Sequence, residues 1–383
     1  MPRFMLNETS YHGKGAIANI VPEIKARGFK KVLVCTDESL VKFGVSKKVT
    51  DLLDEGGVNY QLFTEIKPNP TIENVLAGVK AAKEFQADAL VAIGGGSSMD
   101  TAKAIGIIIT NPEFEDVRSL EGVAPTKHPC LPIIAVPTTA GTAAEVTINY
   151  VITDVQKKRK FVCVDVHDMP IVAVVDPDMM ASMPKSLKAF TGMDALTHAI
   201  EGYTTRGAWE MSDMFHIKAI ELIAKNLRDS VAGLEKGGEN MALAQYIAGM
   251  GFSNVGLGVD HSMAHTLSAY YNMPHGKACA TLLPTVMAYN APVTGEKYRD
   301  IAAAFDVEGA YTMPLEEARA AAVAAVKKLG EDVGITMSLK GVVPLEDVDA
   351  LSADALKDAC TPGNPRPVTV EDIKAMFLSL IEA

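Results

Sequence analysis

The chain is poor in the features that would place it outside the cell or in a membrane. It has only five cysteines, and their odd number and wide spacing favour reduced, buried thiols over disulfides or a thiolate metal cage. No stretch approaches the roughly 18 consecutive apolar residues of a membrane span, and residues 1–8 lack the apolar core of a signal peptide. We therefore expect a cytoplasmic protein that has no membrane partner.

Positive charge is also scarce. Lys and Arg number 36 against 47 Asp and Glu, which leaves a formal net charge of -11, and the only basic run is the short KKRK at residues 157–160. Nucleic-acid phosphates would be repelled by such a surface, so no nucleic-acid partner is expected. With 48% hydrophobic and 22% charged residues, the composition is typical of a soluble globular protein, and 383 residues predict two domains.

The first half of the chain alternates short β-branched runs with helical patterns. Apolar runs occur at residues 31–36, 89–93, 133–136 and 171–175, and such runs indicate buried parallel strands. A helix that begins after Thr71 separates the first two runs. The pattern predicts an α/β, doubly wound nucleotide-binding domain over residues 1–183.

After Pro184 strand-like runs give way to long amphipathic stretches. Examples are residues 212–226, residues 315–329, which Gly330 is expected to end, and a terminal helix from Val370 that Thr369 and Asp372 would cap. Residues 184–383 are therefore predicted to form an all-α C-terminal domain.

A glycine-rich loop follows the second predicted strand. Residues 94–98, GGGSS, run from this strand into an apolar helix, so the glycines would let the backbone approach a diphosphate at the helix N-terminus. The loop is not the G-x-G-x-x-G fingerprint, and a tight strand-to-helix turn is the structural alternative. A second polar loop, which carries Thr138, Thr139 and Thr142, leaves the third strand and would line the same ligand site.

Asp37 ends the first predicted strand. A carboxylate there would accept hydrogen bonds from an adenosine ribose and repel a 2′-phosphate, which favours NAD over NADP. The alternative is that Asp37 caps a helix that starts at Glu38.

One aspartate and four histidines in the second half have metal-ligand spacing. They fall as Asp194-x3-His198 and His261-x3-His265-x9-His275, and residues four apart share one helix face. A turn at residues 272–274 would let His275 fold back on the same ion. We predict a shared divalent metal site, although surface pairs or core histidines would show the same spacing.

Over essentially its whole length, the chain resembles the iron-containing alcohol dehydrogenases, and most of all their lactaldehyde reductase (propanediol oxidoreductase) branch. The resemblance lies in GGGS at 94–97, PTTAGT at 137–142, GMDALTHAIE at 192–201, HSMAH at 261–265 and PHG at 274–276. It implies a ferrous ion on Asp194, His198, His261 and His275, with His265 beside the metal as a proton relay. It also implies an NAD-linked exchange between lactaldehyde and propane-1,2-diol, or between similar small aldehydes and alcohols, by a homodimer.

The resemblance extends to the other ligands. It implies NAD binding by Asp37, Asn69, Gly94, Gly95, Gly96, Ser97, Ser98, Thr138, Thr139, Thr142 and Lys160. It implies a small substrate pocket lined by Asn149, Phe252 and Cys360.

Two residues beside His261 depart from the family pattern. Asp260 and Ser262 stand where an apolar residue and a glycine are expected, and an extra carboxylate there would alter metal preference. Because histidine and carboxylate ligands suit several first-row ions, zinc is an alternative to iron, as in a zinc-dependent, glycerol-type polyol dehydrogenase. A dehydroquinate-synthase-like lyase would need more basic residues near the metal, and a non-enzymatic NAD-binding protein would need no metal ligands.

Overall fold

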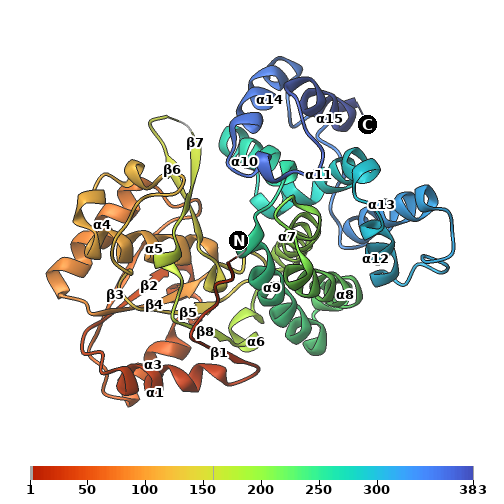
Figure 1. The fold of residues 1–383 in the computed structure, drawn as a ribbon. Coiled ribbons are helices and arrows are strands. Elements are labelled where there is room, and N and C mark those ends of the chain that lie inside the picture. The colour runs from red at the N-terminus through yellow and green to blue at the C-terminus, as the bar shows by residue number, and fades with distance from the viewer. Residues whose placement is uncertain (1–2, 158, 383) are drawn as a thin grey trace. The chain divides into compact units, whose positions relative to one another are not determined.

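The protein divides into two compact units, Met1–Ser182 and Met183–Ala383. The computed structural model describes residues 3–157 and 159–382 (Figure 1). Each unit is considered by itself below.

The first unit is built on a six-stranded parallel sheet. The strand order is β1-β8-β5-β4-β2-β3, and every neighbouring pair is parallel. The strands are β1 Thr9–His12, β2 Val32–Asp37, β3 Tyr60–Ile66, β4 Ala89–Gly94, β5 Ile133–Pro137 and β8 Val172–Val175. An antiparallel pair, β6 Asn149–Asp154 and β7 Arg159–Val164, lies outside the sheet.

Alternate residues of the central strands enter two separate cores, one on each face of the sheet. Val32 and Val34 of β2 pack with Ile20 and Leu53 of the helices on one face. Leu33 and its neighbours pack against the helices of the opposite face. The helices are α1 Ile20–Arg27, α2 Glu38–Lys42, α3 Lys47–Glu55, α4 Ile72–Phe85, α5 Gly96–Thr110 and α6 Pro177–Met180. This arrangement confirms the predicted doubly wound α/β domain.

The strand order reverses between β2 and β4. The chain passes from β2 outward to β3 and then returns to the other side of β2 for β4, β5 and β8. In doubly wound sheets, ligands bind at the carboxyl ends of the strands at this switch point. Asp37 ends β2 and Gly94 ends β4, so both predicted cofactor elements lie there.

Among its described residues 183–382, the second unit contains helices joined by loops and no strand, which confirms the predicted all-α half (Figure 1). Its helices are α7 Lys185–Thr204, α8 Glu210–Ala232, α9 Glu235–Val255, α10 Val259–Tyr271, α11 His275–Asn290, α12 Lys297–Ala304, α13 Leu315–Asp332, α14 Val348–Lys357 and α15 Val370–Glu382. Thr369 caps α15 as predicted, because its hydroxyl accepts from the Asp372 N–H at 3.2 Å while the Asp372 carboxylate accepts from the Thr369 N–H at 2.9 Å.

Gly330 does not end its helix, so this sequence prediction was wrong. Helix α13 continues through Gly330 to Asp332. A Cβ at Gly330 would collide with the terminal methyl of Met337, so the glycine is explained by close packing and not by a turn.

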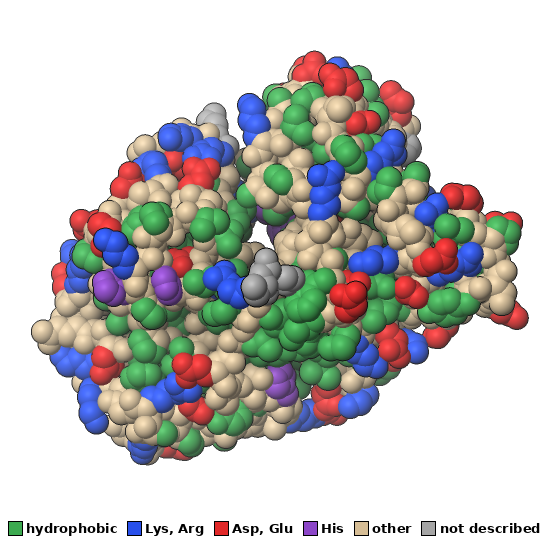
Figure 2. All heavy atoms as spheres, viewed as in Figure 1, with side chains coloured by type: hydrophobic (Ala, Val, Ile, Leu, Met, Phe, Trp, Pro, Cys, Tyr) green, Lys and Arg blue, Asp and Glu red, His purple; other side chains and the backbone are tan. Residues whose placement is uncertain are grey.

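No helix among the described residues combines the length and the apolar character that crossing a membrane requires. On the face that Figure 2 shows, Lys and Arg side chains are interspersed with Asp and Glu. This mixed surface agrees with the absence of a long basic run from the sequence.

Candidate metal centre

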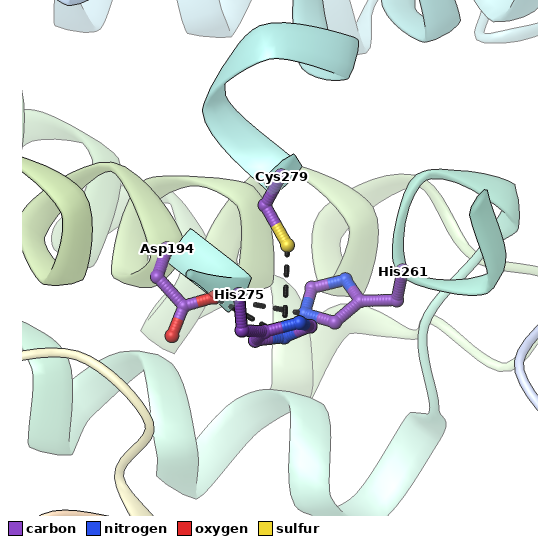
Figure 3. Close-up of side chains that lie close together, drawn as sticks. All are labelled: Asp194, His261, His275 and Cys279. Atoms are coloured by element: carbon purple, nitrogen blue, oxygen red, sulfur yellow. Dashed lines mark hydrogen bonds and ion pairs between the residues drawn. The ribbon is translucent and has the colours of Figure 1, made fainter. Parts of the chain in front are cut away.

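Three helices of the second unit bring together four side chains that could hold a metal ion (Figure 3). Asp194 comes from α7, His261 from α10, and His275 and Cys279 from the first turns of α11. One donor atom from each residue lies within 4.8 Å of the donor atoms of the other three. The turn predicted at residues 272–274 is present, with Asn272 in the left-handed region at φ 51° and His275 as the first residue of α11.

The geometry of these donors fits a metal ion. Asp194 Oδ1 lies 4.0 Å from His261 Nε2 and 3.6 Å from His275 Nε2. Asp194 and His261 are both 2% exposed, yet Asp194 Oδ1 and His261 Nε2 have no hydrogen-bond partner among the described residues. Buried polar atoms normally have partners, so a cation between them would satisfy both.

His198 lies beside this cluster but is not one of its four donors. Its Nδ1 is 4.0 Å from Asp194 Oδ2, and its ring is centred 4.4 Å from the ring of His261. The ring of Phe252 stacks on it at 4.2 Å with an interplanar angle of 11°. The structure thus groups three of the four predicted ligands with Cys279, which sequence reasoning did not propose, although Cys279 is four residues after His275 on α11.

Glu201, one turn beyond His198 on α7, orients His261. Its Oε2 accepts from His261 Nδ1 at 2.7 Å, and its Oε1 accepts from the backbone N–H of Asp260 at 2.8 Å. The first N–H groups of α10 would otherwise have no intrahelical acceptor. Because Nδ1 donates to the carboxylate, the lone pair of Nε2 is left for a metal; metal-binding histidines commonly have such a carboxylate partner on their other ring nitrogen.

Buried negative charge dominates the electrostatics of the cluster. Burial raises the pKa of Asp194 to about 6, and burial together with the charges of Glu201 and Asp194 raises the pKa of Asp260 well above its usual value. Burial lowers the pKa of His261, but its hydrogen bond to Glu201 and the nearby carboxylates outweigh this effect and raise it. A divalent cation among these groups would compensate the carboxylates.

His265, the predicted proton relay, lies one turn along α10 from His261. Its Nδ1 donates to Asp358 Oδ2 at 2.8 Å, and its ring stacks on that of His275 at 5.3 Å. Burial would raise the pKa of Asp358, but the charge and hydrogen bond of His265 lower it below its usual range. Asp358 therefore fixes the ring so that Nε2 remains available to exchange a proton.

In the first unit, the glycine loop begins helix α5 with close contacts. Gly94 has φ 155°, and a Cβ there would collide with Ser98, while a Cβ at Gly96 would lie 3.1 Å from Thr142. A Cβ at Gly95 would likewise lie 3.2 Å from the Thr139 side chain. The two predicted cofactor loops thus pack closely against each other beside the N-terminus of α5, where the helix dipole would favour a diphosphate.

The remaining cofactor candidates of this unit have local partners. Asp37 caps α2 by accepting from the Leu40 N–H at 3.0 Å through Oδ1, so the capping alternative is correct for that oxygen. Lys160 Nζ donates to Asn69 Oδ1 at 2.7 Å, and Asn69 adopts φ 56°. The backbone N–H of Thr138 donates to the carbonyl of Gly94 at 2.9 Å.

Two family models together cover nearly the whole chain. The model for iron-containing alcohol dehydrogenase matches residues 7–177, and the C-terminal model of the Fe-containing alcohol dehydrogenase family matches residues 188–381. The chain belongs to this family.

Individual relatives agree with this membership. The chain is 60% identical to the lactaldehyde reductase of Escherichia coli (strain K12) over 98% of both chains, and 38% identical to the NAD-dependent methanol dehydrogenase of Bacillus methanolicus over 97% and 98%. A crystal structure of a 1,3-propanediol oxidoreductase matches with a TM-score of 0.96 and 39% identity, over 99% of this chain and all of the other.

Membership of the iron-containing alcohol dehydrogenases makes the chain an oxidoreductase that acts on alcohols and aldehydes. The family implies a metal ion and a nicotinamide dinucleotide, and the donor cluster and the glycine loop suit these two groups. The lyase and the non-enzymatic alternatives are thereby set aside.

The predicted pocket residues occupy different elements of this dehydrogenase. In the second unit, Phe252 of α9 stacks on His198, and the Cys360 N–H donates to Asp358 at 2.9 Å. Asn149, in the first unit, begins β6, and its carbonyl accepts from Lys103 Nζ at 2.9 Å.

Proposed function

We propose that the enzyme interconverts lactaldehyde and propane-1,2-diol, or closely similar small aldehydes and alcohols, with NAD(H) and ferrous iron. The observation that carries the proposal is the 60% identity to a lactaldehyde reductase along 98% of both chains. We also propose a cytoplasmic homodimer, on the family tendency and on free cysteines throughout the described chain.

In this proposal each unit has its own task. Residues 1–183 bind NAD through Asp37, Asn69, Gly94, Gly95, Gly96, Ser97, Ser98, Thr138, Thr139, Thr142 and Lys160. Residues 184–383 hold the metal through Asp194, His198, His261 and His275. Asn149, Phe252 and Cys360 would line the substrate pocket.

The residues of the second unit support the chemistry directly. When bound, a divalent ion would polarise the substrate oxygen as a Lewis acid, and the nicotinamide would exchange the hydride. Glu201 holds the His261 ring in the tautomer that leaves Nε2 unprotonated. His265 would take the hydroxyl proton at Nε2 during oxidation and return it during reduction, while Asp358 stabilises the protonated ring.

The test is NADH oxidation with lactaldehyde by protein that a chelator has stripped of metal and that is refilled, without oxygen, with ferrous iron or with zinc. Recovery with iron supports the proposal. Recovery with zinc and activity on glycerol would instead favour a polyol dehydrogenase, and failure with both ions would refute the metal assignment.

A matched pair of variants sharpens this test. His261→Ala should lose bound metal and turnover together, because Nε2 faces Asp194 in the cluster. The control is His128→Ala in the first unit, which lies outside both candidate sites and should retain both properties.

A further inference from the structure

Lys103 is a completely buried lysine on α5, the helix that begins with the glycine loop. Its Nζ donates to the carbonyl oxygen of Thr147 at 2.5 Å, to the hydroxyl of Thr147 at 3.0 Å and to the carbonyl oxygen of Asn149 at 2.9 Å. Thr147 ends the threonine loop, which is the segment of residues 138–148 between β5 and β6. We propose that Lys103 is a positioning residue that holds the threonine loop against the glycine loop for NAD binding; the inference rests on the proposed function.

The acceptors around the ammonium group come from one short stretch of the chain. A lysine ammonium has three N–H donors, and the two Thr147 oxygens and the Asn149 carbonyl oxygen match them in number. Asp168, which is also completely buried, supplies the opposite charge. Its Oδ1 lies 3.7 Å from Nζ, too far for a hydrogen bond, and neither carboxylate oxygen has a hydrogen-bond partner among the described residues. Asp168 therefore balances the charge of Lys103 without competing for the donors that hold the loop.

A second residue of α5 holds the strand that follows the loop. Asp100 is three residues before Lys103, so the two side chains share one face of the helix. Its Oδ2 accepts from the backbone N–H of Val151 in β6 at 3.1 Å. The cation of this face thus binds a backbone carbonyl of β6, and the carboxylate binds a backbone N–H. Together they fix where β6 begins along α5, and Asn149, one of the proposed pocket residues, is the first residue of that strand.

The threonine loop is held at both ends and strained between them. Its first N–H donates to the glycine loop, and its last turn is held by Lys103. Between these contacts Ala143 has φ 52°, a left-handed conformation that is unfavourable for a residue with a Cβ. Such strain persists only where the surrounding structure maintains it. Without Lys103 the turn can relax, and Thr142, which would lie 3.1 Å from a Cβ on Gly96, would move away from the start of α5.

The affinity for NADH, measured by the fluorescence of the bound nucleotide without substrate, tests the proposal independently of turnover. Lys103→Met keeps the length of the side chain but removes all three donors, so NADH should bind about tenfold more weakly or worse. This variant also leaves Asp168 without its cation. The double variant Lys103→Met/Asp168→Asn removes that charge, so it should recover stability in urea unfolding but not NADH affinity. Lys80→Met, which changes an exposed lysine of α4, is the control and should match the wild-type protein.

A milder variant covers the case in which no Lys103 variant folds. Thr147→Val removes one acceptor and leaves Lys103 and Asp168 paired, so NADH affinity should fall by about threefold to tenfold and the loss should appear in the KM for NADH and not in kcat. Wild-type affinity in the folded double variant or in Thr147→Val overturns the proposal and leaves Lys103 only the role of neutralising Asp168. A lower kcat with an unchanged KM overturns it as well. Failure of the wild-type protein to bind NADH overturns the proposed NAD function itself.

Discussion

Replacing Glu201 tests how strongly the candidate metal centre depends on a residue that is not a ligand. Glu201 is 4% exposed and accepts from His261 Nδ1 at 2.7 Å and from the backbone N–H groups of Asp260 and His261 at 2.8 and 3.4 Å. In Glu201→Leu these buried donors lose their acceptor. Each unsatisfied group costs about 1–3 kcal/mol, so unfolding of the second unit should become easier by at least about 3 kcal/mol.

Glu201→Gln keeps the shape but exchanges one acceptor oxygen for an NH2 donor. If the NH2 group faces His261 Nδ1, that nitrogen must accept, and its proton moves to Nε2, which faces Asp194. If it faces the Asp260 N–H, two donors oppose each other. We expect metal affinity to fall by about 10- to 100-fold, as for other outer-shell partners of histidine ligands.

The assay is competition for zinc or cobalt against a chromophoric chelator, with urea unfolding measured in parallel. Glu331→Gln removes an exposed carboxylate of α13 and serves as the control. If Glu201→Gln bound metal within about twofold of the wild-type protein, the tautomer argument would be wrong, since removing the hydrogen-bond partner of a ligand histidine typically lowers metal affinity tenfold or more.

Three further predictions concern packing, pH and proton transfer. Gly276→Ala forces α11 away from the backbone of α7 and should destabilise the protein by about 1–3 kcal/mol in urea unfolding. The control is Gly238→Ala in α9, where the added methyl group has no atom within 4 Å and the substitution should be neutral or stabilising. Burial lowers the pKa of His216 to about 3, so below its ordinary value of 6.5 the unfolded chain binds a proton that the folded protein does not, and stability falls as pH falls from 6.5 toward 3. At pH 5 this loss of stability is roughly 2 kcal/mol. Urea unfolding, followed by the fluorescence of the single tryptophan, should show it as a lower midpoint at pH 5 than at pH 7, and His216→Gln should remove this part of the difference. Asp358→Asn should lower turnover and change its pH profile through His265 while one metal per chain is retained; loss of the metal would refute the relay role.

The central sheet could be predicted because its strands are buried on both faces. Strands β2, β4, β5 and β8 consist almost entirely of buried residues and appear in the sequence as continuous apolar runs. The sequence did not predict strands β3 and β6, because their residues are not continuously buried. β3 lies at the sheet edge with mixed burial, and β6 alternates between half-buried and buried positions, so neither forms such a run.

The spacing of the histidines predicted which helix faces carry the site but not how each ring is turned. Asp194, His261 and His275 converge as expected, while His198 lies on the correct face and stacks on Phe252 from another helix. Such a contact depends on how α7 and α9 pack and has no local signal. The role of Glu201 has no local sequence signal either, because it requires the N-terminus of α10 to lie against α7.

The departure at Ser262 has a local explanation. Its hydroxyl lies 3.3 Å from Asp358 Oδ1 and accepts from the Thr361 hydroxyl at 2.8 Å. The serine therefore joins α10 to the carboxylate that orients His265. A glycine would leave Thr361 and Asp358 with one partner fewer.

Asp260 has no comparable network. It is completely buried, neither of its carboxylate oxygens has a hydrogen-bond partner within the described residues, and Glu201 and Asp194 add negative charge nearby. An ionised carboxylate in such a place is costly unless it is neutralised by a proton or by a nearby cation. A metal among Asp194, His261 and their neighbours would supply that positive charge, so metal binding and the stability of the second unit are expected to be coupled. The raised pKa of Asp260 means that a proton alone can neutralise it, while a metal bound by its neighbours would favour the ionised form; the Asp260 oxygens are not themselves among the converging donors.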